Sequence, residues 1–383
     1  MTTAKHRLLA AWKRTDALFE RLPDLFARTI PLRHPFVFYL GHLPAFAWNH
    51  LAVGVLGKAP KGPFDKLFAF GIDPENKQAA AELSISKWPS VEAIIAYRDQ
   101  VRTDVLELLP ELASTPGVMA ERGRIVHMVA EHELLHQETL LYMVQAGGYA
   151  LQDTVVGGDG EPATQVSVPA GTAVLGTDFD SLDFGWDNEF PKTQVQVSAF
   201  AIDSLPVRIV DWQAFVAEGG PVPDNWQGDT VRTLAGIVPR KAILGWPVQV
   251  SQQQAVAYAR WKGRRLPTEA ELARVRHLPA GANVNVQRFT PVPVGTAGPS
   301  PSGVREVVGN GWEWTQTLWR PLPGFKAYIP SYPGFSADFF DERHVVMVGG
   351  SWATDASLLR SSFRNWFPVH YPYVFSKFRT VAV

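Results

Sequence analysis

The sequence predicts two domains of different fold class, an α-helical domain followed by a loop-rich α+β domain. Up to about residue 150, apolar side chains recur at helical spacing over long stretches. After about residue 155 the helical runs shorten, glycine and proline become frequent, and strand-like segments alternate with turns. A length of 383 residues also favours two domains. We therefore expect a helical domain over residues 1–155 and an α+β domain over residues 156–383.

Four helices are predicted in the first domain. The first is indicated by apolar residues at helical spacing, namely Leu8, Leu9, Trp12, Leu18, Phe19, Leu22 and Phe26. The second begins near Pro35 and contains the longest apolar run, 36–48, which is too short to span a bilayer. The third begins near Ser90, and the fourth follows Thr115-Pro116 and ends at Gly147-Gly148. Four long helices suggest an up-down bundle whose interior can hold a metal ion.

The second domain is predicted to hold short strands at 164–168, 194–200 and 344–348. One clear helix is expected over 251–262, ending at Gly263. The domain boundary is expected in the glycine-rich turn Gly157-Gly158-Asp159-Gly160.

The composition limits the classes of function. The hydrophobic fraction is 46% and the charged fraction 19%, as in soluble globular proteins, and the formal net charge of -1 gives no electrostatic case for nucleic acid or a membrane surface. Residues 1–14 show no secretory signal pattern. The absence of cysteine excludes disulfides, thiolate metal sites and cysteine nucleophiles, and it fits a cytoplasmic location. The abundant aromatic residues indicate large cores or a site for a cationic or ring-shaped ligand.

The most informative motif is His132-Glu133-Leu134-Leu135-His136. Histidines four residues apart lie on one face of a helix, so both imidazoles can bind one metal ion. The same pattern occurs in zinc metalloproteases, where the glutamate is the general base. No protease-type third ligand follows here, because the chain enters the glycine-rich turn.

The third ligand is better sought in the second helix. His127 points about 140° away from His132 at 100° per residue, whereas His42 lies in an otherwise apolar segment and needs a partner if buried. Three neutral imidazoles leave open coordination positions, which suits Fe(II) better than a closed structural zinc site. The ligands alone do not decide the metal, and a core histidine that binds nothing remains the alternative.

The motifs resemble those of ergothioneine-synthase-like non-heme iron enzymes, which join a DinB-type helical bundle to a formylglycine-generating-enzyme-like (sulfatase-modifying-factor) fold related to C-type lectins. The first part of the resemblance is carried by 130–141 and by Leu40-Gly41-His42. The second part is carried by segments 184–189, 263–271, 308–315, 349–352 and 362–366. The absence of cysteine excludes formylglycine generation itself, so the resemblance there concerns the fold.

The resemblance implies that Fe(II) is held by His42, His132 and His136 and that hercynine, the trimethylated betaine of histidine, binds the iron through its imidazole. Asn365 and Trp366 match positions that hold the betaine end, which suits an amide donor and an aromatic face. Oxygen then drives bonding of sulfur or selenium to the imidazole carbon.

Further roles follow from the same resemblance. Tyr328 falls where the family has an active-site tyrosine that donates a proton or an electron. Arg98 and Arg102 match carboxylate-binding arginines of members that use γ-glutamylcysteine, although a solvated helix face is the alternative. Leu135 replaces the glutamine that many ergothioneine synthases carry before the second helical histidine.

One departure concerns the chalcogen donor. Where members that use γ-glutamylcysteine carry an aspartate and an arginine, this chain has Phe367 and Tyr371, followed by Tyr373. Aromatic faces and hydroxyl groups suit an uncharged sugar better than a zwitterionic thiol. The sequence therefore favours selenoneine synthesis, with hercynine, oxygen and a selenosugar as small-molecule partners. The alternatives are an ergothioneine-type synthase that takes cysteine or γ-glutamylcysteine, a zinc peptidase, and a non-catalytic sugar-binding module.

Overall fold

The computed structural model describes residues 1–31, 33–69, 88–329 and 331–383. By their internal contacts the described residues form two compact units. The first unit contains Met1–Gly147 together with two short segments from later in the chain, Leu182–Phe184 and Tyr328–Tyr332. The second unit contains Gly148–Ser181, Gly185–Ala327 and Pro333–Val383. The two short segments that join the first unit were not expected from the sequence.

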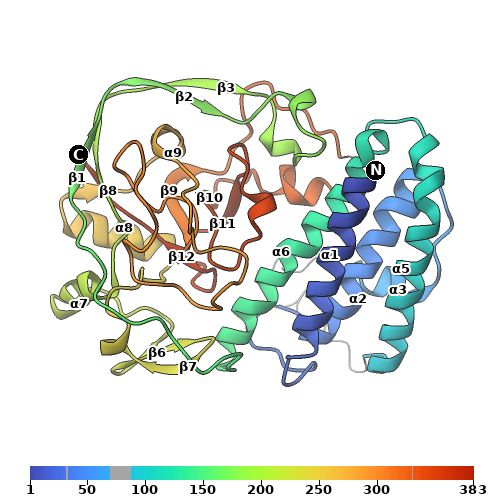
Figure 1. The fold of residues 1–383 in the computed structure, drawn as a ribbon, viewed down its shortest axis with the longest axis horizontal. Coiled ribbons are helices and arrows are strands. Elements are labelled where there is room, and N and C mark those ends of the chain that lie inside the picture. Colours follow the sequence, from blue (N-terminus) through green and yellow to red (C-terminus); the bar gives the residue numbers. More distant parts are fainter. Residues whose placement is uncertain (32, 70–87, 330) are drawn as a thin grey trace. The chain divides into compact units, whose positions relative to one another are not determined.

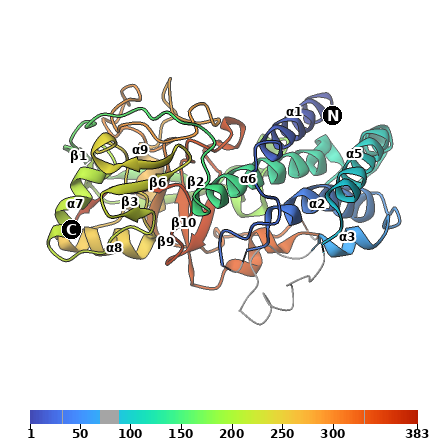
Figure 2. The same cartoon turned by 90° about the horizontal axis from the view of Figure 1, so that it is seen from below.

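The first unit is built from helices. They are α1 (Thr2–Phe19), α2 (Phe36–Ala47), the π-helix η1 (Trp48–Val55), α3 (Pro63–Leu67), α5 (Val91–Ser114), the 3₁₀-helix η2 (Glu121–Gly123) and α6 (Arg124–Ala146). Helix α1 packs against α6, and α2 packs against both α5 and α6, as Figures 1 and 2 show. Every residue of α2 is buried, in keeping with a composition that is apolar or aromatic apart from His42.

Two of the predicted helix boundaries agree with the structure, and one does not. The hydroxyl group of Ser90 accepts a hydrogen bond from the backbone N–H of Ala93 and begins α5, as predicted. Helix α6 ends at Ala146 with Gly147 as its C-cap residue, also as predicted. The predicted start of the fourth helix at Thr115-Pro116 was wrong, because the chain first forms a turn and begins α6 after Gly123, which has a φ of 68°. Helix α1 ends at Phe19, so Phe26 lies outside it and is 53% exposed.

The second unit is rich in short strands, in keeping with the predicted α+β class. In the part of the chain that the structure describes, one sheet has the order β1-β4-β13-β8 and another the order β11-β10-β9-β12. A hairpin β2-β3 and a small sheet β5-β6-β7 complete the set. The strands are β1 (Gln165–Val168), β2 (Gly171–Leu175), β3 (Thr193–Val197), β4 (Phe200–Asp203), β5 (Trp226–Gln227), β6 (Thr230–Thr233), β7 (Gly236–Pro239), β8 (Arg264–Arg265), β9 (Trp312–Leu318), β10 (His344–Val348), β11 (Asn365–Pro368), β12 (Ser376–Lys377) and β13 (Val381–Ala382).

The helices of this unit exceed the single one expected. They are α7 (Ile209–Ala217), α8 (Gln252–Trp261) and α9 (Glu269–Val275), with short 3₁₀ turns η3 (Phe179–Ser181), η4 (Asp187–Glu189), η5 (Arg240–Ala242), η6 (Pro333–Phe335), η7 (Ala337–Phe339) and η8 (Ala356–Leu358). The predicted helix is α8, capped by Ser251. Helix α7, with nine residues, and α9, with seven, are too short for a clear periodic signal.

The strand predictions were confirmed at β10, whose five residues are all buried. The predicted strand at 194–200 is divided in the structure, because β3 ends at Val197 and β4 begins at Phe200. Strand β10 lies between β9 and β11 in the sheet order. Helix α9 packs on β9 and β10, so this sheet forms part of the core of the unit. None of the helices in the described ranges is long and apolar enough to cross a bilayer.

Candidate metal centre

Helix α2 supplies the first of three clustered histidines. The side chain of His42 is 7% exposed and stacks on Phe38, with ring centroids 5.0 Å apart. Its Nδ1 atom lies 2.8 Å from the carbonyl oxygen of Phe68. A carbonyl can only accept, so Nδ1 carries the proton and donates it, and Nε2 keeps its lone pair. A backbone carbonyl on one ring nitrogen is the usual way to orient an imidazole that binds metal through the other.

Helix α6 supplies the other two histidines one turn apart. His132 and His136 are 3% and 5% exposed, and their Nε2 atoms are 3.0 Å apart. The ring of Phe46, one turn after His42 on α2, stacks on His132 at a centroid distance of 3.5 Å and an interplanar angle of 5°. This stacking fixes the plane of the His132 imidazole.

One potential ligand atom from each of the three histidines lies within 4.8 Å of the other two. Within the described ranges, this is the single group of three or more histidine or acidic residues that could hold a metal ion. His127 is not part of the group, as its direction on the helix predicted. The structure therefore brings together the three residues that the sequence analysis selected as ligands.

Burial keeps the three imidazoles neutral. It lowers the pKa of His42 to about 4, and it lowers the pKa values of His132 and His136 well below the usual value. The neighbouring histidines add to the effect, because two protonated rings would repel each other. Neutral imidazoles have the lone pair that a transition metal needs, so the donor set fits a divalent ion bound by three nitrogen atoms with other positions open.

Glu133 is the general-base candidate of the peptidase hypothesis, but its carboxylate takes part in a different set of contacts. It is 2% exposed, and the guanidinium group of Arg102 on α5 lies 3.6 Å from it. Burial raises the pKa of Glu133 to about 7, opposed by the charge of Arg102 and by a hydrogen bond with Thr15 on α1. Its partners are thus on α1 and α5, inside the helical unit, although its Oε1 atom accepts no hydrogen bond from the described residues.

The two arginines of α5 are held by an acidic residue of α1. Arg102 donates two hydrogen bonds to the carboxylate of Asp16, at 2.8 and 2.7 Å, and Arg98 donates one at 3.3 Å. The guanidinium group of Arg102 also lies over the ring of Trp12 at 5.1 Å. Both arginines therefore tie α5 to α1. This arrangement favours the structural interpretation of the pair over the carboxylate-binding one.

A tyrosine that the sequence analysis did not select lies close to the histidines. Tyr332 contacts His132 edge to face, with ring centroids 6.0 Å apart, and also contacts Phe46 and His50 at 5.0 and 5.4 Å. Tyr328, the predicted catalytic tyrosine, is half-buried four residues earlier in the same segment of the first unit. Phe46 and His50 follow His42 at intervals of four residues, a signal of a shared helix face that the sequence already carried.

The remaining predicted residues lie together in the second unit, on and after β11. The indole N–H of Trp366 donates to the carbonyl oxygen of Phe335, and its ring stacks on Phe339 at 4.0 Å. The side-chain oxygen of Asn365 accepts a hydrogen bond from the backbone N–H of Trp366. One face of Trp366 is therefore occupied by packing inside this unit.

The predicted aromatic wall consists of side chains that contact one another. The rings of Phe367 and Tyr371 are stacked at 5.2 Å, and Tyr373 meets Tyr371 edge to face at 5.2 Å. All three residues are half-buried. The backbone carbonyl of Tyr373 accepts a hydrogen bond from Gln249, which fixes the end of the segment.

Comparison with known proteins defines the class of protein. Residues 154–383 match the family described as Sulfatase-modifying factor enzyme 1-like domain, and residues 7–140 match the DinB superfamily. The two matches follow one another along the chain, so the protein combines a DinB-type domain with a sulfatase-modifying-factor-type domain.

The relatives identify the family. The hercynine oxygenase of Mycolicibacterium thermoresistibile is 35% identical, over 69% of this chain and 68% of that protein. The hercynine oxygenase of Mycolicibacterium smegmatis is 34% identical, over 71% of this chain and 73% of that protein. Ergothioneine biosynthesis protein 1 of Neurospora crassa is 29% identical, over 97% of this chain and 57% of that protein, so the chain spans little more than half of this fungal relative. The chain belongs to the ergothioneine-synthase-like family.

Proposed function

We propose that this protein is a non-heme Fe(II), O₂-dependent enzyme that joins a chalcogen donor to the imidazole of hercynine. The observation that carries the proposal is the group His42, His132 and His136, three neutral and buried imidazoles with ligand atoms within 4.8 Å of one another. Membership of a family that contains enzymes named hercynine oxygenase supports hercynine as the substrate. When bound, Fe(II) would supply activation of oxygen.

The domain arrangement proposed from the sequence is retained here. We assign the iron ligands to a DinB-like bundle formed by α1, α2, α5 and α6, and the substrate residues to the domain that follows near residue 155. Asn365 and Trp366 would hold the betaine end of hercynine, through an amide group and an aromatic face for the quaternary ammonium. The cytoplasm is the proposed location.

Two tyrosines compete for the role of proton donor. Tyr332 is favoured by its edge-to-face contact with His132, and Tyr328 by the sequence resemblance alone. A general acid has to come within hydrogen-bond reach of the reacting atoms, directly or through one water molecule. We assign the role to Tyr332, because its ring contacts a proposed iron ligand, and retain Tyr328 as the alternative to be tested.

We propose a selenosugar as the donor. The stacked rings of Phe367 and Tyr371 and the neighbouring Tyr373 offer apolar faces and hydroxyl groups, as a polyhydroxylated and uncharged ligand requires. The arginines that would hold a zwitterionic thiol are engaged with Asp16. The new carbon–selenium bond replaces a C–H bond of the imidazole and an Se–H bond of the donor, which releases two protons and two electrons. Dioxygen takes up both and becomes hydrogen peroxide, or, where one oxygen atom is also transferred to selenium, the product is a selenoxide and one water molecule.

A competition assay tests both parts of the proposal. Metal-free protein is loaded with Fe(II) and supplied with hercynine and air. A selenosugar, the matching thiosugar, cysteine and γ-glutamylcysteine compete as donors, and the products are separated by mass. We expect the selenosugar adduct to dominate and its formation to disappear in His132→Ala. Turnover unchanged in that variant would exclude the iron assignment.

The second candidate is an ergothioneine-type synthase that uses cysteine or γ-glutamylcysteine. It is favoured by the names of the relatives. In the same assay it predicts a hercynine–thiol product in preference to the sugar adduct. A product with neither class of donor would contradict both candidates.

A further inference from the structure

The second unit contains a lysine in an unusual environment. Lys377 lies on β12, its side chain is fully buried, and its ammonium group donates hydrogen bonds to backbone carbonyl oxygens of the segment before β9. The accepting residues are Gly309 at 2.8 Å, Val307 at 3.3 Å, and Gly311. The carboxylate of Glu313 lies 3.7 Å from the same ammonium group. We call these four oxygen groups, the carbonyl groups of Val307, Gly309 and Gly311 and the carboxylate of Glu313, the carbonyl cage.

The backbone conformation directs the three carbonyl groups toward the ammonium group of Lys377. Gly309 and Asn310 have φ angles of 83° and 65°, both in the left-handed region that glycine adopts most readily. The side chain of Asn310 is locked by hydrogen bonds with Asn283 and with the backbone of Val292. A Cβ atom on Gly311 would lie 3.1 Å from the Cβ atom of Lys377, a tight contact, so the glycine favours the close approach of the two segments.

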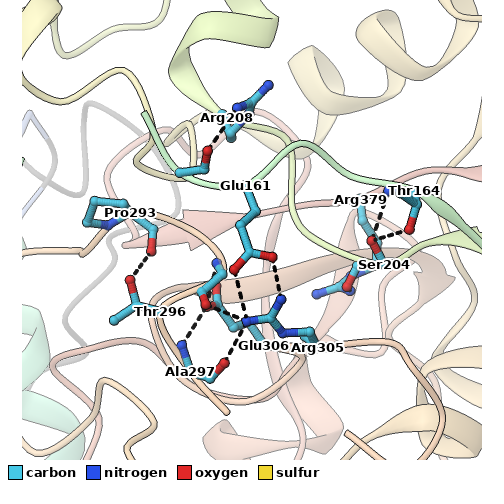
Figure 3. A network of polar contacts seen from close by, with 12 residues as sticks. Glu161, Thr164, Ser204, Arg208, Pro293, Thr296, Ala297, Arg305, Glu306 and Arg379 are labelled. Atoms are coloured by element: carbon cyan, nitrogen blue, oxygen red, sulfur yellow. Dashed lines mark hydrogen bonds and ion pairs between the residues drawn. The ribbon is translucent and has the colours of Figure 1, made fainter. Parts of the chain in front are cut away.

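The surrounding charges also favour a cation. Glu313 is fully buried and pairs with Arg379 at 2.9 Å, so one positive charge beside it is already present. Glu306 is a second buried carboxylate, whose Oε1 accepts hydrogen bonds from the backbone N–H groups of Gly295 and Ala297 (Figure 3). Its Oε2 is buried with no hydrogen-bond partner among the described residues. Without Lys377, the positive charge of Arg379 alone would act against the two carboxylates of Glu306 and Glu313.

Such a set of oxygen atoms is what a hard metal ion prefers. Calcium takes six to eight oxygen ligands from carboxylates and backbone carbonyls in flexible geometry, whereas magnesium needs near-ideal octahedral geometry and keeps several waters. The cage offers three carbonyl groups and the carboxylate of Glu313, and the charge of Glu306 acts on the same ammonium group. Burial lowers the pKa of Lys377 to about 8, opposed by Glu313, so the amine is mainly protonated at neutral pH.

We propose that the carbonyl cage is a cation-binding site that the chain fills with its own ammonium group, so that the second unit folds without a metal ion there. Removing the side chain of Lys377 converts the cage into a calcium site. This inference is independent of the iron centre and of the reaction proposed above.

Two substitutions of Lys377 test the proposal that the carbonyl cage is a cation-binding site. Lys377→Ala leaves space for a cation, whereas Lys377→Met removes the charge but keeps an aliphatic chain in the cage. The proteins are freed of metal, and their thermal unfolding is followed by tryptophan fluorescence with Ca²⁺, Mg²⁺, K⁺ or no added cation. Lys192→Ala, which removes a lysine that is 47% exposed, serves as the control.

We expect both Lys377 variants to unfold at lower temperature than the wild type without added cation. Ca²⁺ is expected to raise the midpoint of Lys377→Ala by about 5 °C and to leave Lys377→Met, Lys192→Ala and the wild type unchanged. If Lys377→Ala is recovered only as unfolded protein, refolding with Ca²⁺ but not without it is the supporting result.

Four results would overturn the proposal. One is a wild type that Ca²⁺ stabilises, because its cage would then not be filled by lysine. Another is Lys377→Ala as stable as the wild type without cation. A third is Lys377→Ala that no cation restores, and the fourth is a variant that K⁺ or Mg²⁺ restores better than Ca²⁺.

Discussion

The buried histidine cluster makes the metal-free protein sensitive to acid. In the folded chain burial lowers the pKa of His42 from 6.5 to about 4, and unfolding returns the ring to water. Between these two values the unfolded state binds a proton that the folded state does not, so the free energy of unfolding falls as the pH falls. The contribution of His42 is fully present above the unfolded pKa and is lost as the pH drops toward 4.

The size of the effect follows from the two pKa values. When the pH is lowered from 7 to 5, His42 alone should reduce the free energy of unfolding by about 2 kcal/mol, since a pKa difference of one unit corresponds to about 1.4 kcal/mol. His132 and His136 shift in the same direction and add to the loss. Replacing His42 by glutamine, which does not titrate, should therefore make the free energy of unfolding less dependent on pH.

Urea unfolding of the metal-free protein, followed by far-ultraviolet circular dichroism at both pH values, measures this difference. Leu43→Ala is the matched control, since it removes a buried apolar side chain from the same helix and should lower the free energy of unfolding equally at both pH values. We expect His42→Gln to lose about 2 kcal/mol less than the wild type between pH 7 and pH 5. An equal loss in the two proteins would refute the assignment of His42 as a buried, neutral imidazole.

Two further predictions concern the backbone and the tyrosines. Gly349 has a φ of 88°, and a Cβ atom there would overlap the carbonyl oxygen of Val307. Gly349→Ala should therefore lower the free energy of unfolding by about 3 kcal/mol or more. Gly263 has a φ of 65° and open space around it, so Gly263→Ala should lower the free energy of unfolding by only about 1 kcal/mol. Equal unfolding midpoints for the two variants in urea would argue against this packing. Tyr332→Phe should lower the rate of hercynine consumption at least tenfold with unchanged iron content, because the ring of Tyr332 contacts His132. Tyr328→Phe should leave this rate within about a factor of two if Tyr332 is the proton donor. The opposite order of rates would move the proton donor to Tyr328.

Much of the helical unit could be predicted because its signals are local. Ser90 caps the start of α5 in the helical unit, and in the second unit Ser251 caps the start of α8 in the same way. Gly263, with a φ of 65°, follows the end of α8. The start of α6 could not be predicted in this way, because Thr115-Pro116 has the chemistry of a helix start although the chain there forms a turn. Left-handed backbone at Arg122 and Gly123, rather than a capping side chain, precedes the true start.

In the candidate site too, residues with a local sequence signal could be predicted, and residues that depend on long-range contacts could not. His132 and His136 share a helix face by spacing alone, and His42 was found because a polar ring in an apolar helix needs a partner. Tyr332 could not be found, since its contact with His132 joins segments far apart in the sequence and depends on a loop that belongs to the first unit. The packing of Trp366 on Phe339 and the pairing of Arg102 with Asp16 are also long-range contacts that spacing does not predict.

The central claim is that one buried ring from α2 completes a metal site with two rings from α6. Titration of the metal-free protein with Co(II), which absorbs visible light when it is bound by nitrogen ligands, measures it most directly. We expect one ion per chain for the wild type, and an affinity at least a hundredfold lower for His42→Ala with the helical circular dichroism signal retained. Equal affinity in the variant and the wild type would contradict the claim.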